Sequence, residues 1–254
     1  MKRISLIATL CLCYFFSIGQ TTQGKTTVVR YETLTGPEAI RKMEASKPKD
    51  PRIYDVNGKV IDSAEVQRLL ATYEYWLGRH RINNEYKHVL SKINFEQQAE
   101  IDRETKLKLK PYSPKLQEGT TLDLKPFKKY TDIKALDDKA IVLIIWCDGC
   151  YGGNIDAYKP VNDVLRRFIN QEKLAIMTVT SHSVEQANVA LKKSPIINTQ
   201  HIIAATDIIK EFEIKRPVIL ITDTDHKILY SVTNNAEMTA RTLFFTLREI
   251  VGLQ

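Results

Sequence analysis

Two cysteines separated by two residues are the part of this sequence best suited to chemistry. Cys147 and Cys150 follow the apolar run 141–145 and Trp146. The run is short and rich in β-branched residues, which predicts a strand covered on both faces, as in the centre of an α/β sheet. Cysteines at this spacing can close a small disulfide ring, and a helix that starts nearby would lower the pKa of the first thiol. The pattern therefore predicts a redox centre where a buried strand ends.

The first nineteen residues have the layout of a secretory signal peptide. A basic pair precedes the apolar run 4–18, and small residues flank position 18. The run is shorter than the roughly 20 residues that a membrane-spanning helix needs. We therefore expect cleavage near Gln20, a periplasmic or extracellular location and no stable membrane span after processing. A retained membrane anchor is the alternative.

Cleavage would also change the cysteine count. Cys11 and Cys13 would be lost, so the exported form would hold only Cys147 and Cys150. An exported protein with one close pair is not a scaffold stapled by disulfides. The pair is therefore better suited to cycling between reduced and oxidised states than to a structural role.

Haem and zinc sites use the same cysteine spacing. A c-type haem site requires His directly after the second cysteine, where this chain has Tyr151. Structural zinc requires four ligands, but His182, His201 and His226 are scattered along the chain. We therefore expect no metal and no cofactor.

The composition gives little reason to expect nucleic-acid binding. The chain has 254 residues, of which 43% are hydrophobic and 26% charged, as in ordinary globular proteins. Loss of the signal segment would lower the net charge from +7 to +5. The basic runs 106–115 and 125–129 lack the interleaved aromatic residues that stack on bases, so we interpret them as solvated linker.

The amino-terminal part, residues 20–110, is predicted to be a small, mainly helical region. A polar lead-in comes first, and the Asn-Gly at positions 57–58 predicts a hairpin. Apolar spacing then predicts one helix from Asp62 or Ser63 to Gly78 and a second over 83–105. No metal-site spacing surrounds the two histidines of this region.

Strand-like and helix-like segments alternate in residues 117–254, after a linker rich in proline and glycine. Such alternation implies crossover connections and a largely parallel sheet. The predicted strands are 141–146, 174–179, 217–222 and 227–232, and the predicted helices are 158–169, 183–193, 206–212 and 236–251.

Two motifs about seventy residues apart resemble those of the thioredoxin-like superfamily, most closely the exported reductases of the TlpA/ResA type. They are Trp146-Cys147-x-x-Cys150 and the strand that opens with Arg216-Pro217. The resemblance covers residues 117–254. It implies an α/β, thioredoxin-like fold, here with a small, mainly helical amino-terminal extension.

The resemblance also implies roles for these residues. Cys147 would attack a protein disulfide, Cys150 would resolve the mixed disulfide, and an upstream electron-donor protein would reduce the pair again. Trp146 would shield the pair. Pro217 would be cis and shape the groove for the partner's backbone, beside Arg216.

Three departures from the family pattern bear on reactivity. The dipeptide between the cysteines is Asp148-Gly149, and Ile141 stands where many thioredoxins bury an acidic residue. Gly152-Gly153 either bends the first turn of the helix or moves its start to Asn154. A neighbouring carboxylate and a distant helix end both disfavour the Cys147 thiolate, whereas an inward-pointing Arg216 would favour it. We expect a reducing pair.

Two other functions are compatible with parts of the pattern. One is a thioredoxin-like binding module with a static disulfide. The other is a thiol peroxidase, which would need Thr or Ser three residues before its reactive cysteine, where this chain has Ile144.

Overall fold

The computed structural model describes residues 38, 41, 44, 45, 47–147, 158–233 and 236–252, with only the backbone of 236–238. The chain divides into two compact units, Met1–Ile93 and Asn94–Gln254. Several predicted features lie outside the described residues. These are the signal peptide 1–19, the cleavage site at Gln20, Asp148, Gly149, Cys150, Tyr151, Gly152, Gly153 and Asn154.

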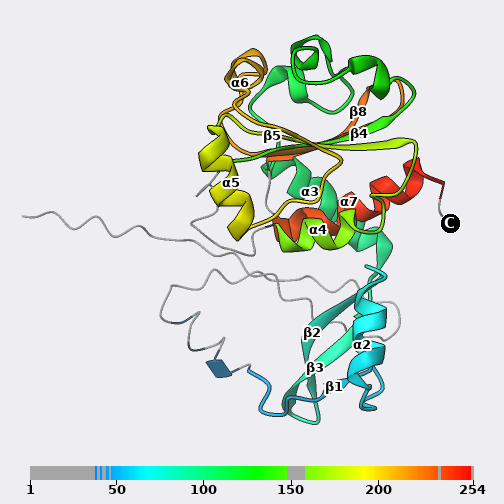
Figure 1. Ribbon diagram of the computed structural model, residues 1–254. Helices are drawn as coiled ribbons and strands as arrows, with labels where there is room; N and C mark the ends of the chain where they lie inside the picture. The colour runs from blue at the N-terminus through cyan, green and yellow to red at the C-terminus, as the bar shows by residue number, and fades with distance from the viewer. Residues whose placement is uncertain are drawn as a thin grey trace, which may run out of the picture. The chain divides into compact units, whose positions relative to one another are not determined.

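The first unit contains a three-stranded sheet, in the order β1-β3-β2, and helix α2 (Figure 1). Its elements are β1 (Ile53–Tyr54), α2 (Ser63–Leu70), β2 (Tyr75–Ile82) and β3 (Glu85–Lys92). β1 is parallel to β3, and β2 is antiparallel to it. The Asp62 carboxylate caps α2 by accepting hydrogen bonds from the N–H groups of Ala64 and Glu65.

Two helix predictions for this region are wrong in part. The helix expected to reach Gly78 ends at Leu70, and residues 85–92 of the second expected helix form β3. The cause is the Asn83-Asn84 pair, which has φ of 49° and 66° and joins β2 to β3 as a two-residue hairpin turn. The region therefore contains a three-stranded sheet in addition to its helices. The hairpin expected around Asn57-Gly58 is present, with Tyr54 bridged to Val60.

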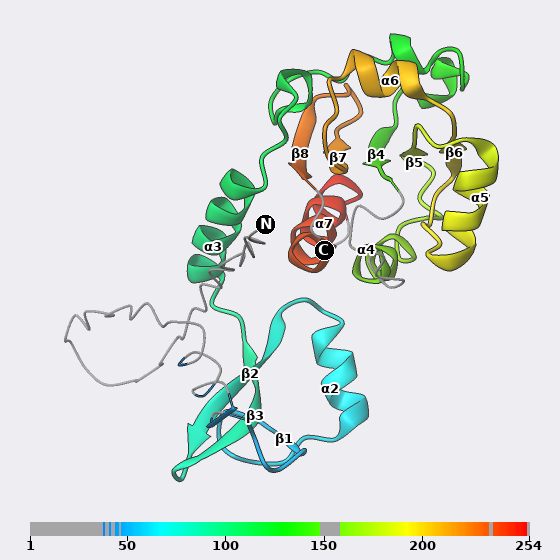
Figure 2. The ribbon, with the colours of Figure 1, turned by 90° about the vertical axis from the view of Figure 1, so that its left-hand side faces the viewer.

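A five-stranded sheet, in the order β6-β5-β4-β7-β8, forms the second unit (Figure 2). The strands are β4 (Ala140–Ile145), β5 (Leu174–Val179), β6 (Gln200–Ile202), β7 (Val218–Thr222) and β8 (Ile228–Thr233). β4, β5 and β6 are mutually parallel, as the strand–helix alternation predicts. β7 is antiparallel to β4 and to β8, so the expectation of a largely parallel sheet holds for only three of the five strands.

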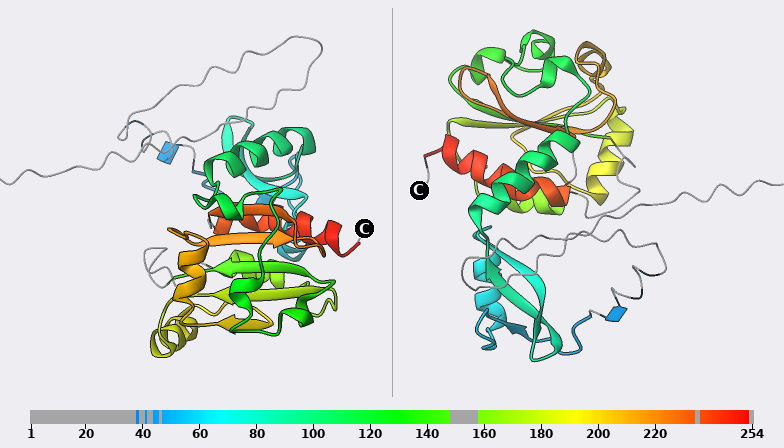
Figure 3. Two further views of the ribbon diagram at one scale, coloured as in Figure 1. Left: turned by 90° about the horizontal axis from the view of Figure 1, so that it is seen from above. Right: turned by 180° about the vertical axis from the view of Figure 1, so that it is seen from behind.

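Helices and short turns cover both faces of this sheet (Figures 1 and 3). α4 (Lys159–Leu165) and α7 (Ala236–Ile250) pack against each other on one face. The other face carries α6 (Thr206–Glu211) and the 3-10 turns η1 (Pro114–Leu116), η2 (Lys125–Phe127) and η3 (Ile133–Leu136). α5 (Val184–Lys193) lies beside β5 and β6. All six residues of β4 are buried between these layers.

α3 (Phe95–Lys108) approaches the edge strand β8 with its carboxyl-terminal end. The Lys106 ammonium sits 5.2 Å from the ring centroid of Tyr230, on β8, and 3.1 Å from the Glu118 carboxylate. Burial and the nearby Glu118 and Asp102 carboxylates raise the pKa of Tyr230. The ring therefore stays neutral under the positively charged lysine.

The segment after α3 is not the solvated linker that its prolines and lysines suggest. Leu116, Leu122 and Phe127 are buried in the core. The Gly119 N–H donates to the Ile228 carbonyl at 2.8 Å, and the Ile228 N–H donates to the carbonyl of Thr120 at 2.8 Å. The segment is therefore tied to the start of β8.

The second unit has a thioredoxin-like fold. Its central strand, β4, has a parallel neighbour on one side and an antiparallel hairpin, β7–β8, on the other, and a terminal helix follows. This is the order that the cysteine and proline motifs imply.

Thr222 joins β7 to the start of β4 in the core. Its Oγ1 accepts a hydrogen bond from the Ile141 N–H at 3.1 Å and donates one to the Asp223 carbonyl at 2.9 Å. Thr222→Val would leave the buried Ile141 N–H without a partner. We expect it to lower the free energy of unfolding by about 1–3 kcal/mol.

Urea titration measures this difference. Thr242→Val on α7 is the matched control, because Thr242 is a half-buried residue whose hydroxyl makes no hydrogen bond within the described part of the chain. Equal losses of stability in the two variants would contradict the role given to Thr222.

Candidate redox site

Cys147 lies directly beyond the end of the central strand. The Trp146 N–H donates to the Val179 carbonyl at 2.9 Å, which continues the pairing of β4 with β5 by one residue. Cys147 follows, is half-buried and is disulfide-bonded. Because Cys150 lies outside the described residues, its pairing with Cys147 remains part of the functional proposal.

The start of β7 lies opposite this cysteine. Ile145 pairs with Val218 in the antiparallel register of β4 and β7. Trp146 directly follows Ile145, and Pro217 directly precedes Val218, so the two motifs begin at this last pair of the β4–β7 ladder. The sheet thus brings together two motifs that are about seventy residues apart in the sequence.

The prediction that Pro217 is cis is wrong, because the described residues contain no cis peptide bond. A trans bond is the form that an X-Pro peptide prefers by about 0.5–1 kcal/mol. Pro217 is half-buried, and its missing N–H leaves no donor just before β7 begins.

Arg216 does not point inward. Its side chain is exposed, and its guanidinium carbon lies 5.4 Å from the ring centroid of Tyr112. This is cation–π geometry at the surface. The guanidinium is therefore held by an aromatic ring and is not aimed into the core beside the cysteine.

Trp146 lies in the core beside Cys147. It is only 4% exposed, and its indole N–H has no hydrogen-bond partner within the described residues. The indole packs against the imidazole of His182, with ring centroids 5.7 Å apart and planes tilted by 58°. Trp146 therefore forms a buried wall next to the cysteine.

Sequence reasoning missed His182 as a member of this site. It treated the histidines of the second unit only as scattered zinc candidates. The available signal was position, because His182 follows β5 by three residues and parallel strands end at the same edge of a sheet. The structure places its ring on the tryptophan that precedes Cys147.

The fully buried polar residues of the described chain offer hydroxyl and amide groups but no carboxylate. Seven polar residues are buried in the described part of the chain: Ser113, Asn162, Thr178, Thr180, Thr222, Ser231 and Thr239. Ile141, in the position of the acidic residue of many thioredoxins, is fully buried in β4. Within the described residues, no fully buried carboxylate is therefore present to accept a proton from Cys147.

The other histidines of this unit have different surroundings. His201, on β6, has Nδ1 against the Thr178 hydroxyl and Nε2 2.8 Å from the Asn198 amide nitrogen. Burial lowers its pKa, so the neutral form is favoured. His226 is in the β7–β8 turn. Within the described residues, no three His, Cys, Asp or Glu side chains form a group that could hold a metal ion.

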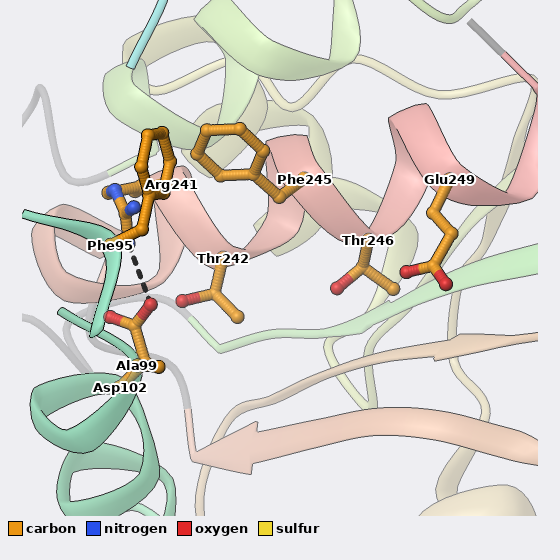
Figure 4. A pocket seen from close by; sticks show the side chains of 8 residues that line it. All are labelled: Phe95, Ala99, Asp102, Arg241, Thr242, Phe245, Thr246 and Glu249. Carbon is orange, nitrogen blue, oxygen red and sulfur yellow. Dashed lines mark hydrogen bonds and ion pairs between the residues drawn. The ribbon is translucent and has the colours of Figure 1, made fainter. Parts of the chain in front are cut away.

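A small pocket lies between α3 and α7 (Figure 4). Phe95 and Phe245 form its aromatic walls, with centroids 6.4 Å apart, and Arg241 pairs with Asp102 at 2.7 Å. None of its lining residues belongs to the cysteine site: Phe95, Ala99, Asp102, Arg241, Thr242, Phe245, Thr246 and Glu249. The pocket therefore does not contribute to the redox site.

The position of Arg216 leads to a prediction about the reduced protein. An opposite charge within about 4–6 Å would lower the pKa of a thiol by one unit or more, a tenfold change in thiolate fraction below that pKa. Because the guanidinium lies on Tyr112, we expect Arg216→Ala to change the alkylation rate of Cys147 by less than about twofold. Timed iodoacetamide labelling between pH 6 and 9 measures this rate.

Arg166→Ala, at an exposed position on the carboxyl-terminal side of α4, is the control for a general loss of charge. A tenfold slower reaction of Arg216→Ala alone would show that the guanidinium acts on Cys147.

No protein-family model and no curated protein sequence matches this chain. Among solved structures it is similar to the thioredoxin domain of a thiol-disulfide oxidoreductase from Bacteroides vulgatus. The two are 16% identical with a TM-score of 0.38, over 48% of this chain and 85% of the other.

Two further structures match a similar share of the chain. A thiol:disulfide interchange protein from a Bacteroides species is 16% identical with a TM-score of 0.38, over 48% of this chain and 79% of the other. A thioredoxin family thiol:disulfide interchange protein from Chlorobium tepidum is 13% identical with a TM-score of 0.35, over 47% and 84%. The thioredoxin-like fold of the second unit rests on its own strand order.

Proposed function

We propose that this chain is an exported thiol–disulfide oxidoreductase that exchanges a Cys147–Cys150 disulfide with partner proteins and works as a reductase. One observation carries the proposal: Cys147 is disulfide-bonded at the end of the buried central strand, opposite the start of β7. Cys147 is a half-buried residue, so part of it is accessible to a partner, while the strand fixes its position.

The reaction is a pair of thiolate displacements. The Cys147 thiolate attacks one sulfur of the partner disulfide, an S–S bond forms between the proteins, and the other partner sulfur leaves as a thiolate. The Cys150 thiolate then attacks the Cys147 sulfur and releases the second partner thiolate. Two electrons and two protons pass to the partner. A dithiol donor protein restores the reduced pair by the same steps in reverse.

Two observations on the described residues support the reducing direction. A pair becomes oxidising when a cation or helix end stabilises its thiolate. Arg216 lies on Tyr112, and the described helix α4 begins only at Lys159, nine residues after Cys150. Neither group stabilises the thiolate strongly, so the disulfide form is favoured and the dithiol gives up its electrons readily.

A peroxide-reducing reaction has less support. It would need a hydroxyl three residues before the reactive cysteine, and Ile144 at that position is fully buried within β4. Within the described residues, no helix is both long and apolar enough to cross a membrane. Export of the mature chain is part of the proposal and rests on the layout of residues 1–19.

Trapping of the mixed disulfide tests the proposal. Cys150→Ser in the full chain, expressed in the native host, removes the resolving thiol, so Cys147 should remain linked to its partners. We expect bands on a non-reducing gel that disappear with dithiothreitol. Mass spectrometry then identifies the proteins held.

Cys147→Ser with Cys150 intact is the matched control, because Cys150 is expected to be shielded and to trap little. If neither variant held a partner while the wild-type pair stayed oxidised throughout, the disulfide would be static and the chain a binding module.

A further inference from the structure

We propose that α3 is a detachable strap that opens from α7 while the five-stranded sheet stays folded, and that the Asp102–Arg241 ion pair holds it closed. The proposal concerns a conformational change within the second unit and does not depend on the thiol–disulfide exchange. Opening uncovers a surface of α7 that the closed protein hides.

One line of residues along α3 faces the rest of the unit. Phe95, Ala99, Asp102 and Lys106 are spaced at i, i+4, i+7 and i+11, so they lie on the same side of the helix. The first three line the pocket beside α7 (Figure 4), and the Lys106 ammonium lies over the ring of Tyr230 on β8. This line of residues carries a ring, a methyl group, a carboxylate and an ammonium, but no large aliphatic side chain.

α3 buries very little of its own surface. None of its 14 residues is buried. Phe95 is 49% exposed, and the aliphatic side chains of Ile101 and Leu107, which are not on the inward line, are 54% and 66% exposed. An apolar face packed on the core stabilises most helices of globular proteins, and α3 has no such face. Polar contacts must therefore carry much of its attachment.

The ion pair to α7 is the central contact of this attachment. An Asp102 carboxylate oxygen lies 2.7 Å from an Arg241 guanidinium nitrogen, and the two side chains are only 27% and 17% exposed. The guanidinium carbon also lies 4.9 Å from the ring centroid of Phe245. Because water reaches this pair less freely, it contributes more than the exposed Glu100–Arg103 pair within α3.

The residues after α3 are tied to the unit by backbone hydrogen bonds. The Thr233 N–H, at the end of β8, donates to the Leu109 carbonyl. The Gln117 side-chain amide donates to the Pro111 carbonyl at 2.7 Å. The carboxyl-terminal end of α3 is thus the hinge, and opening separates Phe95 and Asp102 from α7.

The helix loses its support once it leaves α7. Isolated helices shorter than about 12–15 residues are marginal in water. Pairs within the helix, such as Glu100–Arg103, add little to this. The amide groups of open α3 therefore exchange with solvent, while those of the central strand stay protected. Local opening of this kind is what native-state hydrogen exchange detects.

Hydrogen exchange of the full-length protein, followed by mass spectrometry, tests the proposal on residues 98–108 and on β4. We expect α3 in the wild type to be protected, yet to exchange at least about tenfold faster than β4. Asp102→Asn keeps the shape of the side chain and removes its charge. At low ionic strength it should speed exchange in α3 by about tenfold and leave β4 unchanged, since the lost hydrogen bond is charge-assisted.

Two further variants and a change of salt isolate the ion pair. Arg241→Gln removes the other partner and should match Asp102→Asn. Glu100→Gln removes a carboxylate from the exposed pair of the same helix, so exchange in α3 should stay within about twofold of the wild type. In 1 M salt, where the Debye length is about 3 Å, the tenfold effect of Asp102→Asn should fall to about threefold.

Several outcomes would overturn the proposal. If wild-type α3 exchanged as slowly as β4, it would open only when the whole unit unfolds. If it showed no protection at all, it would not be docked. The ion pair would have no such role if Asp102→Asn and Arg241→Gln left exchange in α3 unchanged, if they sped exchange in β4 equally, or if Glu100→Gln had the same effect. A difference that did not depend on salt would also exclude the charge as its cause.

Discussion

The burial of β4 is the constraint on which the second unit depends. All six of its side chains are buried, and five of them are large aliphatic groups, each worth about 2 kcal/mol on removal from water. Such a strand is stable only with hydrogen-bonded neighbours on both edges and packed layers on both faces, and β5, β7 and the surrounding helices supply these. The end of the same strand fixes the position of Cys147. A single apolar run therefore determines both the core and the location of the reactive sulfur.

The proposed reactivity of Cys147 depends on two charged groups that are not beside it. The buried carboxylate of many thioredoxins is replaced by Ile141, which contributes only to packing. Arg216, which would stabilise a thiolate, is held at the surface by Tyr112. Both features favour a thiol of ordinary acidity and a stable disulfide. The described group that remains in contact with the site is His182, through Trp146.

The positions of most strands in the second unit, and which of them are neighbours, could be predicted from the sequence. Short β-branched runs mark β4, β5 and β7 because a strand buried on both faces must be apolar at every position. Spacing between the cysteine and proline motifs predicts which strands meet. The direction of β7 could not be derived from alternation alone, since it depends on the connection through the short strand β6 and helix α6. The side chains of Arg216 and His182 were also beyond prediction, because their partners Tyr112 and Trp146 come from distant parts of the chain.

Secondary structure was predicted less well in the first unit, because the apolar spacing there is ambiguous. Apolar residues in 75–92 recur at spacings that fit a helix as well as a strand, and the deciding signal is the two-residue turn at Asn83-Asn84. Pairing across that turn then buries Val89 and Leu90. Proline and glycine in 111–119 likewise indicated a linker, yet Leu116 in this segment is fully buried. In both places contacts distant in the sequence outweighed local composition.

The most direct test of the account is a redox titration of the mature protein in glutathione buffers, with the thiols of Cys147 and Cys150 counted by mass after alkylation. We expect one reversible two-electron transition in which both thiols appear together, at a potential nearer to that of thioredoxin, about −270 mV, than to the −120 mV or so of strongly oxidising periplasmic enzymes. A pair that is largely reduced in a buffer poised like an oxidising compartment, or one that no reductant opens without unfolding the protein, would contradict the account.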